Sequence, residues 1–159
     1  MSITVVERSP TPRVTGQSID VRGSAIEVVR RMKLEQALRD MNTTETGTSF
    51  IDPKEKIFAQ FIAGDSFTAE HEVLRADLCE IFLKATEGFD NVKYIYGTSI
   101  ASLEDTEKNV NVTFANGSKE TYDIVVAADG STSRTRSMFL DPQTVKNSYN
   151  FLGQYIAYF

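Results

Sequence analysis

The sequence contains no tryptophan, one histidine, one cysteine and four prolines among its 159 residues. A single cysteine, Cys79, excludes an internal disulfide, which fits a reducing compartment. The lone histidine, His71, makes no metal site by itself, and its two flanking glutamates predict an exposed side chain. No apolar run approaches the roughly 18 residues that a membrane-spanning helix needs. Since Met1–Pro10 also lacks the apolar core of a secretory signal, we expect a cytoplasmic protein with no membrane partner.

Positive charge is also scarce. Seventeen lysines and arginines against 22 aspartates and glutamates give a net charge of −5. This balance argues against a general nucleic-acid binder, which needs a basic surface. Hydrophobic residues make up 41% of the chain and charged residues 25%, as in ordinary globular domains, and the length predicts one domain with a proper core.

Hydrophobic periodicity predicts a mixture of helices and strands. Helices are expected at residues 24–40 and 76–87, and strands at residues 3–6, 48–51, 56–63, 91–96, 99–105, 109–114, 121–122, 123–128 and 149–159. Ser24 followed three residues later by Glu27 predicts a capping box at the first helix. Asn116-Gly117 predicts a type I′ hairpin turn.

One segment, DIVVAADGSTSRTR at Asp123–Arg136, combines an apolar run with polar residues at its carboxyl end. Open α/β sheets bind ligands at the carboxyl ends of their strands. Gly130 lets the backbone approach a ligand without a Cβ clash, and Asp129 can accept hydrogen bonds from a sugar hydroxyl or hold waters around a phosphate. A plain turn is the alternative, because Asp-Gly is a common turn pair.

Together with segments upstream, this pattern resembles the second FAD motif of the flavin-dependent aromatic hydroxylases, which include enzymes like para-hydroxybenzoate hydroxylase and the tetracycline oxidases. The resemblance assigns Asp129 and Gly130 to FAD binding. Ile3–Pro10 resembles the family's strand that ends in an acid for the adenosine ribose, which assigns Glu7 and its neighbour Arg8 to the same cofactor. For Glu7, a solvated acid at a strand end is the alternative.

Two further segments carry the resemblance. Gly16–Gly23 is similar to the family's segment leading towards the flavin, and Asp20 matches a position that touches the cofactor in some tetracycline-oxidising members. Val73–Leu78 resembles the family's R-x-x-L helix start, which places Arg75 near the FAD. An ordinary loop aspartate and a surface arginine are the alternatives for these two residues.

The family also has a G-x-G-x-x-G loop for the pyrophosphate, and here no two of the nine glycines stand two residues apart. The resemblance therefore implies an α/β chain cut at both ends. Residues 1–145 are expected to form an incomplete Rossmann-like FAD-binding domain, without the first strand and the phosphate loop, but with an inserted β-hairpin and meander. Residues 146–159 are expected to begin the sheet of a truncated substrate domain.

The implied function is that of an FAD-dependent monooxygenase fragment. Such an enzyme uses NADPH or NADH and O₂ to hydroxylate or epoxidise a small aromatic or polycyclic substrate, for example in secondary metabolism. Because the flavin carries the oxygen chemistry, we expect no catalytic acid or base in this chain, and no metal. The alternatives are an inactive truncated paralogue that binds or regulates through exposed sheet edges, a non-functional fragment, and a flavin reductase or halogenase of the same fold.

Overall fold

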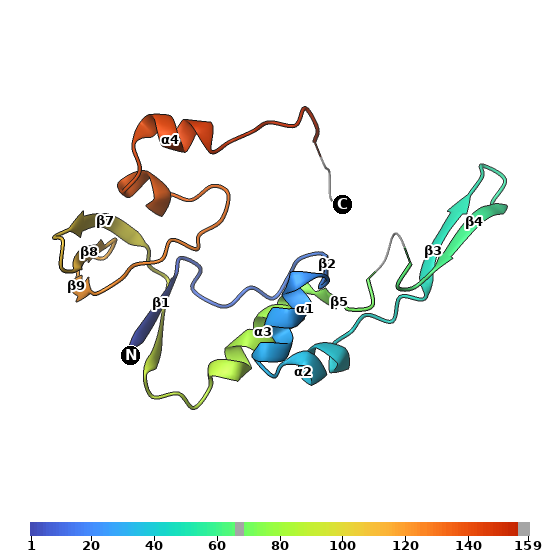
Figure 1. Ribbon diagram of the computed structural model, residues 1–159, viewed down its shortest axis with the longest axis horizontal. Coiled ribbons are helices and arrows are strands. Elements are labelled where there is room, and N and C mark those ends of the chain that lie inside the picture. Colours follow the sequence, from blue (N-terminus) through green and yellow to red (C-terminus); the bar gives the residue numbers. More distant parts are fainter. Residues whose placement is uncertain (66–68, 156–159) are drawn as a thin grey trace. The chain divides into compact units, whose positions relative to one another are not determined.

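The computed structural model describes residues 1–65 and 69–155 as a set of short helices and small sheets (Figure 1). In chain order the elements are β1 (Ile3–Glu7), β2 (Ser18–Asp20), α1 (Ser24–Arg31), α2 (Glu35–Asp40), β3 (Gly47–Ile51), β4 (Ile57–Ile62), β5 (Glu72–Leu74), α3 (Arg75–Thr86), β6 (Val92–Tyr96), β7 (Ile100–Asp105), β8 (Val110–Phe114), β9 (Lys119–Tyr122), the 3-10 helix η1 (Thr135–Met138) and α4 (Pro142–Asn147). The chain divides into two compact units. Unit 1 comprises Met1–Thr4 and Thr11–Lys93, and unit 2 comprises Val5–Pro10 and Tyr94–Phe159. The expected domain boundary after residue 145 stays a prediction.

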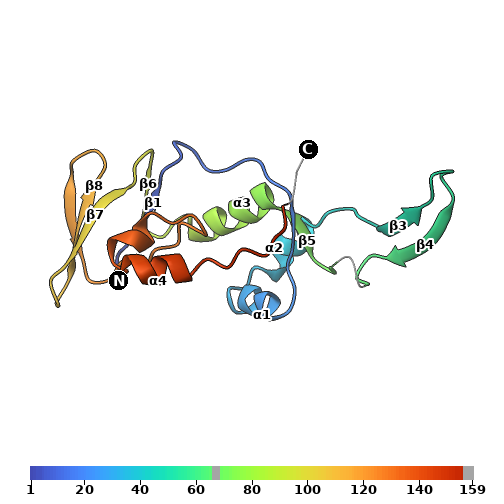
Figure 2. The same cartoon turned by 90° about the horizontal axis from the view of Figure 1, so that it is seen from above.

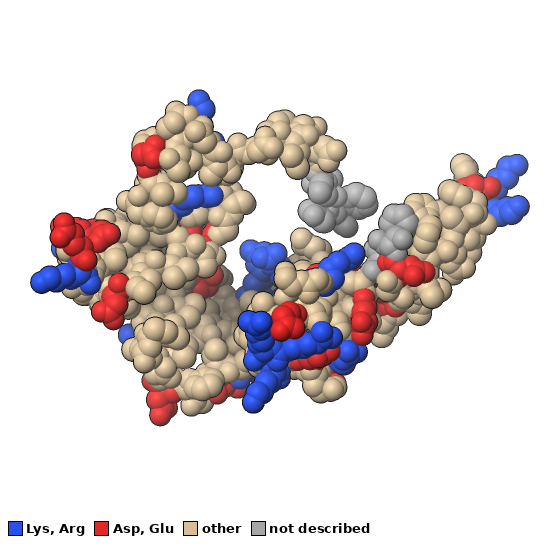
Figure 3. Space-filling view, in the orientation of Figure 1, with Lys and Arg blue, Asp and Glu red and all other residues tan. Residues whose placement is uncertain are grey.

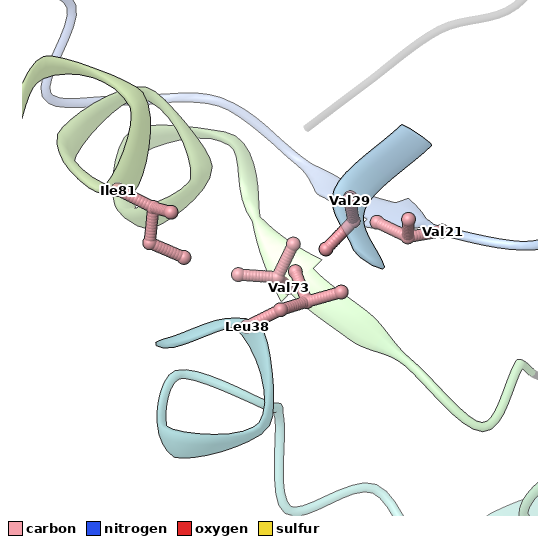
Figure 4. Close-up of a cluster of buried hydrophobic side chains, with 5 residues drawn as sticks. All are labelled: Val21, Val29, Leu38, Val73 and Ile81. Atoms are coloured by element: carbon pink, nitrogen blue, oxygen red, sulfur yellow. The ribbon is translucent and has the colours of Figure 1, made fainter. Parts of the chain in front are cut away.

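The core of unit 1 lies where α1, α2 and α3 pack around the antiparallel pair β2–β5 (Figure 4). It consists of five apolar side chains, each at most 6% exposed: Val21, Val29, Leu38, Val73 and Ile81. Val21 follows β2, Val73 lies in β5, and the other three come from α1, α2 and α3, so this core depends on all of these elements together.

The helix expected at residues 24–40 is in fact two helices, because Lys33 adopts a left-handed φ of 59° between α1 and α2. The break lets Val29 and Leu38 reach the same core. The predicted capping box is also wrong. Gly23 stands at the N-cap, with no side-chain cap, and Glu27 instead pairs with Arg31 one turn along the helix, at 3.1 Å.

Several of the helices in unit 1 carry exposed ion pairs. Figure 3 shows basic and acidic side chains interleaved over α1 and α2. Glu35 accepts from Arg30 and from Arg39, each at 3.0 Å, and the hydrogen bond from Arg30, followed by that from Arg39, lowers the pKa of Glu35. Exposed pairs of this kind contribute about 0–1 kcal/mol each, so the apolar core is the main source of stability.

The strands expected around residues 48–51 and 56–63 form the antiparallel hairpin β3–β4. Phe50 packs edge-on against Phe61, with ring centroids 6.0 Å apart. Phe58 and Ile62 remain 68% and 69% exposed. An isolated two-stranded hairpin is marginally stable in water, so β3–β4 is the least supported element of unit 1.

In unit 2, β7, β8 and β9 form the expected antiparallel meander, whose hairpin β7–β8 is seen from above in Figure 2. The turn between β8 and β9 is not type I′, because only Gly117 has a positive φ, of 85°, and Asn116 does not. Phe114 O accepts from Gly117 N at 2.9 Å, and Phe114 N donates to Ser118 O. This is a longer hairpin loop with glycine in the left-handed position.

The strand expected at residues 123–128 is absent. The segment forms no regular element and pairs with no strand of the described residues, and Ile124 and Val126 are 77% and 80% exposed. An apolar run becomes a buried strand only beside a neighbouring strand, and the described residues supply none here. No strand forms at residues 149–155 either, and the rest of that expected strand, 156–159, lies outside the described residues. The Rossmann-like arrangement of the fold therefore stays a prediction. No helix among the described residues has the length and apolarity to cross a membrane.

Candidate functional site

The Asp-Gly loop of unit 2 is held together by the Asp129 carboxylate. One carboxylate oxygen accepts from the Ser133 hydroxyl. The other accepts from the backbone N–H and the hydroxyl of Thr135, at 3.2 and 3.0 Å. Asp129 therefore ties the turn to the start of η1, and its carboxylate is engaged by its own loop rather than free for a sugar hydroxyl.

These hydrogen bonds set the acidity of Asp129. Partial burial acts to raise its pKa, but the hydrogen bonds from Ser133 and Thr135 outweigh it and lower the pKa from 3.8 to about 2. A lowered folded-state pKa means that the charged carboxylate stabilises the loop above about pH 4. This contribution is lost as the pH falls towards 2.

Gly130 follows with a left-handed φ of 83°, and no atom lies within 4 Å of where its Cβ would be. The backbone at Gly130 is consequently open on the side where a side chain would otherwise stand. That a ligand approaches the backbone here stays a prediction from the sequence.

Glu7 and Arg8 lie at the end of β1, both exposed. The Glu7 carboxylate accepts from Ser9 N at 2.7 Å, and its carbonyl accepts from Thr98 N at 3.3 Å. Thr98 is 8% exposed, and its hydroxyl has no hydrogen-bond partner among the described residues. The strand end thus carries an exposed carboxylate, and its backbone is bonded to Thr98, whose hydroxyl is buried and unpaired among the described residues.

Arg75 opens α3 in unit 1, and its N–H donates to Gln17 O at 3.1 Å. Its side chain lies over Gly16, where an added Cβ would stand 2.9 Å from Arg75 Cδ. Among the described residues the guanidinium has no acid partner. Asp20, by contrast, pairs with Arg22.

Gly16 is expected to affect the position of the Arg75 side chain, because the missing Cβ leaves room for that side chain. Alanine at this position would meet Arg75 and would strain a backbone with a φ of 143°. If Arg75 binds FAD as the resemblance implies, Gly16→Ala should displace the arginine and weaken FAD binding about fivefold, which corresponds to the loss of about 1 kcal/mol. Fluorescence titration with FAD measures the effect.

Gly88→Ala is the matched control, since Gly88 has a φ of 85° and no atom near its missing Cβ. Both variants carry backbone strain, but Gly88→Ala should leave FAD affinity unchanged. Equal affinities for the two variants would show that Gly16 has no role in placing Arg75.

The six predicted site residues thus form two groups. Asp20 and Arg75 lie in unit 1, on or beside β2 and β5. Glu7, Arg8, Asp129 and Gly130 lie in unit 2. Within unit 2, the hydrogen bonds described above lie within the loop around Asp129 and Gly130 or at the strand end of Glu7. These bonds do not join the two parts.

The sequence did not point to two residues, Tyr149 and Thr98, and it misplaced a third, His71. Tyr149 donates from its hydroxyl to Ser131 O at 2.6 Å, inside the Asp-Gly loop. Thr98 carries the unpaired hydroxyl noted above. His71 is only 2% exposed, which corrects the expectation of an exposed histidine. Strand alternation is the signal that could have found it, because Glu70 and Glu72 flank it in an extended segment.

A cavity of about 180 Å³ lies elsewhere in unit 1, and it is lined by three glutamates, Glu45, Glu70 and Glu72, with neutral residues. Glu45 and Glu72 share a hydrogen bond, which raises the pKa of Glu45 and lowers that of Glu72. An acidic lining disfavours the anionic phosphates of a dinucleotide. None of the six predicted site residues lines this cavity.

Comparison with known proteins shows similarity along nearly the whole chain. The FAD-dependent monooxygenase asL4 of Sarocladium schorii is 37% identical over 99% of this chain, and the flavin-dependent monooxygenase eupH of a Phoma species is 36% identical over 99%. The chain spans only 38% and 39% of the lengths of these two relatives. No model of a protein family matches it.

Solved structures of related enzymes show the same similarity at the level of the fold. The tetracycline destructase Tet(55) superposes with a TM-score of 0.75 and 31% identity, over 88% of this chain and 35% of that one. The flavin-dependent monooxygenase PieE, solved with FAD and substrate, superposes with a TM-score of 0.67 over 85% of this chain and 27% of that one. Its identity is 16%, so it shows a shared fold.

Proposed function

Because the chain belongs to the FAD-dependent monooxygenases, matching 38–39% of the length of two of them, we propose that it supplies part of the FAD-binding surface of such an enzyme. The observation that carries this proposal is the Asp-Gly loop. Its backbone is fixed by Asp129, and Gly130 leaves it open to a ligand.

The residues present fit a flavin nucleotide in part. The exposed Glu7 carboxylate at a strand end suits ribose hydroxyls. Thr98, whose N–H bonds to Glu7 O, has a buried hydroxyl that lacks a partner among the described residues. The Arg75 guanidinium, which has no acid partner in the described residues, suits a phosphate or another electron-rich group of the cofactor. Asp20 is a weaker member of the proposed site, since it already pairs with Arg22. Arg8 is retained from the resemblance alone.

In this proposal the bound flavin supplies the redox and oxygen chemistry, and the chain supplies binding and orientation. In unit 2, Asp129 shapes the loop, Gly130 offers its backbone and Glu7 holds the sugar. In unit 1, Arg75 adds positive charge. No residue acts as an acid or a base. A small aromatic or polycyclic substrate, NADPH or NADH as reductant, a role in secondary metabolism, a cytoplasmic location and the absence of a nucleic-acid partner remain predictions from the sequence.

A second candidate function is association without catalysis. The exposed Ile124 and Val126 lie on a segment that pairs with no strand of the described residues and could pair with a strand of another chain. An inactive paralogue that binds or regulates through this edge would need no flavin. A measurement of FAD binding therefore distinguishes the two functions, since only the first requires it.

The test is a titration of the purified chain with FAD, followed by flavin fluorescence and visible absorption. We expect saturable binding with shifted flavin bands. Glu7→Gln should weaken it about tenfold, because hydrogen bonds to a charged group contribute about 1.5–3 kcal/mol. Glutamine keeps an acceptor for Ser9 N, so the strand end should stay folded.

Glu87→Gln, at the exposed C-cap of α3, removes the same charge elsewhere and should leave binding unchanged. A folded wild-type chain that leaves the flavin spectrum unaltered would contradict the proposed function and favour association.

A further inference from the structure

Tyr149, just after α4, reaches back to the Asp-Gly loop. Its hydroxyl donates to Ser131 O at 2.6 Å and accepts from Nη2 of Arg136 at 3.0 Å. Ser131 directly follows Gly130. A residue 18 positions away in the sequence thus bonds to the backbone beside the open glycine.

Arg136 is the second part of this cluster. Its Nη2 donates to the same Ser131 carbonyl, which has two lone pairs and can accept both bonds. The guanidinium carbon also lies 5.1 Å from the centre of the Tyr149 ring, within the range of a cation–π contact. Nη1 reaches Ser148 Oγ at 3.5 Å, and the buried Nε has no partner among the described residues. The terminal nitrogens therefore hold Arg136 in place.

The Tyr149 contacts and the Asp129 contacts fix different sides of the loop. Asp129 binds Ser133 and Thr135, on the side of η1. Tyr149 and Arg136 bind Ser131, on the side of Gly130. Gly130 O also accepts from Ser133 N at 3.2 Å, so the Gly130 backbone is held on one side through Ser133 and on the other through Ser131. The Ser131 side has no hydrogen bond to Asp129 among the described residues, and its attachment is made by Tyr149 and Arg136.

We propose that Tyr149 is a positioning residue, which acts through Arg136 and Ser131 to hold the Gly130 backbone in the conformation that meets the cofactor. This rests on the proposed function, because the cofactor is the flavin nucleotide assigned above. Tyr149 binds no cofactor atom in this account. Its hydroxyl and its ring make separate contributions, through the hydrogen bonds and the cation–π contact.

The test compares amide hydrogen exchange of residues 130–136 in the full chain, without FAD, for wild type, Tyr149→Phe and Tyr149→Leu. Phenylalanine keeps the ring over Arg136 and removes the hydroxyl, so we expect exchange to rise about fivefold, as expected for the loss of about 1 kcal/mol of hydrogen bonding. Leucine removes both and should raise it further. Tyr155→Phe, at a 91% exposed tyrosine, is the matched control and should change nothing.

A double-mutant cycle shows whether Tyr149 acts through Arg136. In an Arg136→Lys background, which lacks the guanidinium fork, Tyr149→Phe should have a much smaller effect. The FAD affinity of the same variants should fall in the same order as their loop protection. Unchanged exchange at residues 130–136 in Tyr149→Phe and Tyr149→Leu, or equal effects in both backgrounds, would overturn the proposal. Wild-type chain that shows the protection but binds no FAD would overturn the proposed function alone.

Discussion

Asp129→Ala is expected to lower the affinity of the chain for FAD by about a hundredfold, the largest effect of any single change in the proposed site. The carboxylate accepts three hydrogen bonds from Ser133 and Thr135. One such bond to a charged acceptor contributes about 1.5–3 kcal/mol, and the upper part of this range corresponds to a hundredfold change, since the ligand itself restores part of the order that the loop loses. Fluorescence titration with FAD at pH 7 measures the loss.

Two variants sharpen this result. Asp129→Asn keeps one acceptor oxygen but turns an N–H₂ group towards a donor, so it should lose most of the affinity as well. Asp52→Ala removes a comparable carboxylate from the β3–β4 turn, where it accepts from Lys54 N and Lys56 N. It should leave FAD affinity unchanged. Equal losses for Asp52→Ala and Asp129→Ala would indicate general destabilisation instead of a role for the loop.

Leu38→Ala is expected to unfold unit 1. Leu38 is 1% exposed and is one of only five buried side chains in that core. Truncating a buried leucine costs about 2–5 kcal/mol, a large part of the stability of a small domain. Urea unfolding followed by far-ultraviolet circular dichroism should show the loss of the transition contributed by α1, α2 and α3.

Leu152→Ala provides the control, since Leu152 is 77% exposed, and a surface change of this kind shifts stability by about 0.5 kcal/mol at most. A Leu38→Ala variant with the unfolding midpoint of wild type would show that the cluster around Val73 is not the core that holds unit 1 together.

The parts of the fold that follow from local signals could be predicted. Helix α3 begins and ends within one residue of the expected bounds. Both signals are local: the spacing of its apolar residues predicts the helix, and Gly88 predicts where it ends. The meander β7–β8–β9 follows from alternation and the turn at Asn116-Gly117. The turn type did not follow, because it depends on how the two strands twist past each other.

The predictions that were wrong concern features that depend on contacts between residues distant in the sequence. An apolar run such as Ile124–Ala128 reads as a buried strand, yet it is buried only if another strand lies beside it. The two flanking glutamates predict that His71 is exposed. In the structure its carbonyl accepts from Val21 N, and its imidazole is buried. The motif predicts that Asp129 and Gly130 bind FAD, but the hydrogen bonds of the carboxylate within the loop and the contact of Tyr149 with Ser131 are visible only in three dimensions.

The central claim is that the backbone around Gly130 binds FAD. Proton–nitrogen correlation spectra of the ¹⁵N-labelled chain, recorded with and without FAD, test it most directly. We predict that the Gly130 and Ser131 amide signals move on addition of FAD, that the Glu7 signal moves with them, and that Asp129→Ala abolishes these shifts. Signals at the β3–β4 turn around Lys54 should stay in place. Saturable FAD binding that leaves Gly130 and Ser131 unmoved would contradict the claim.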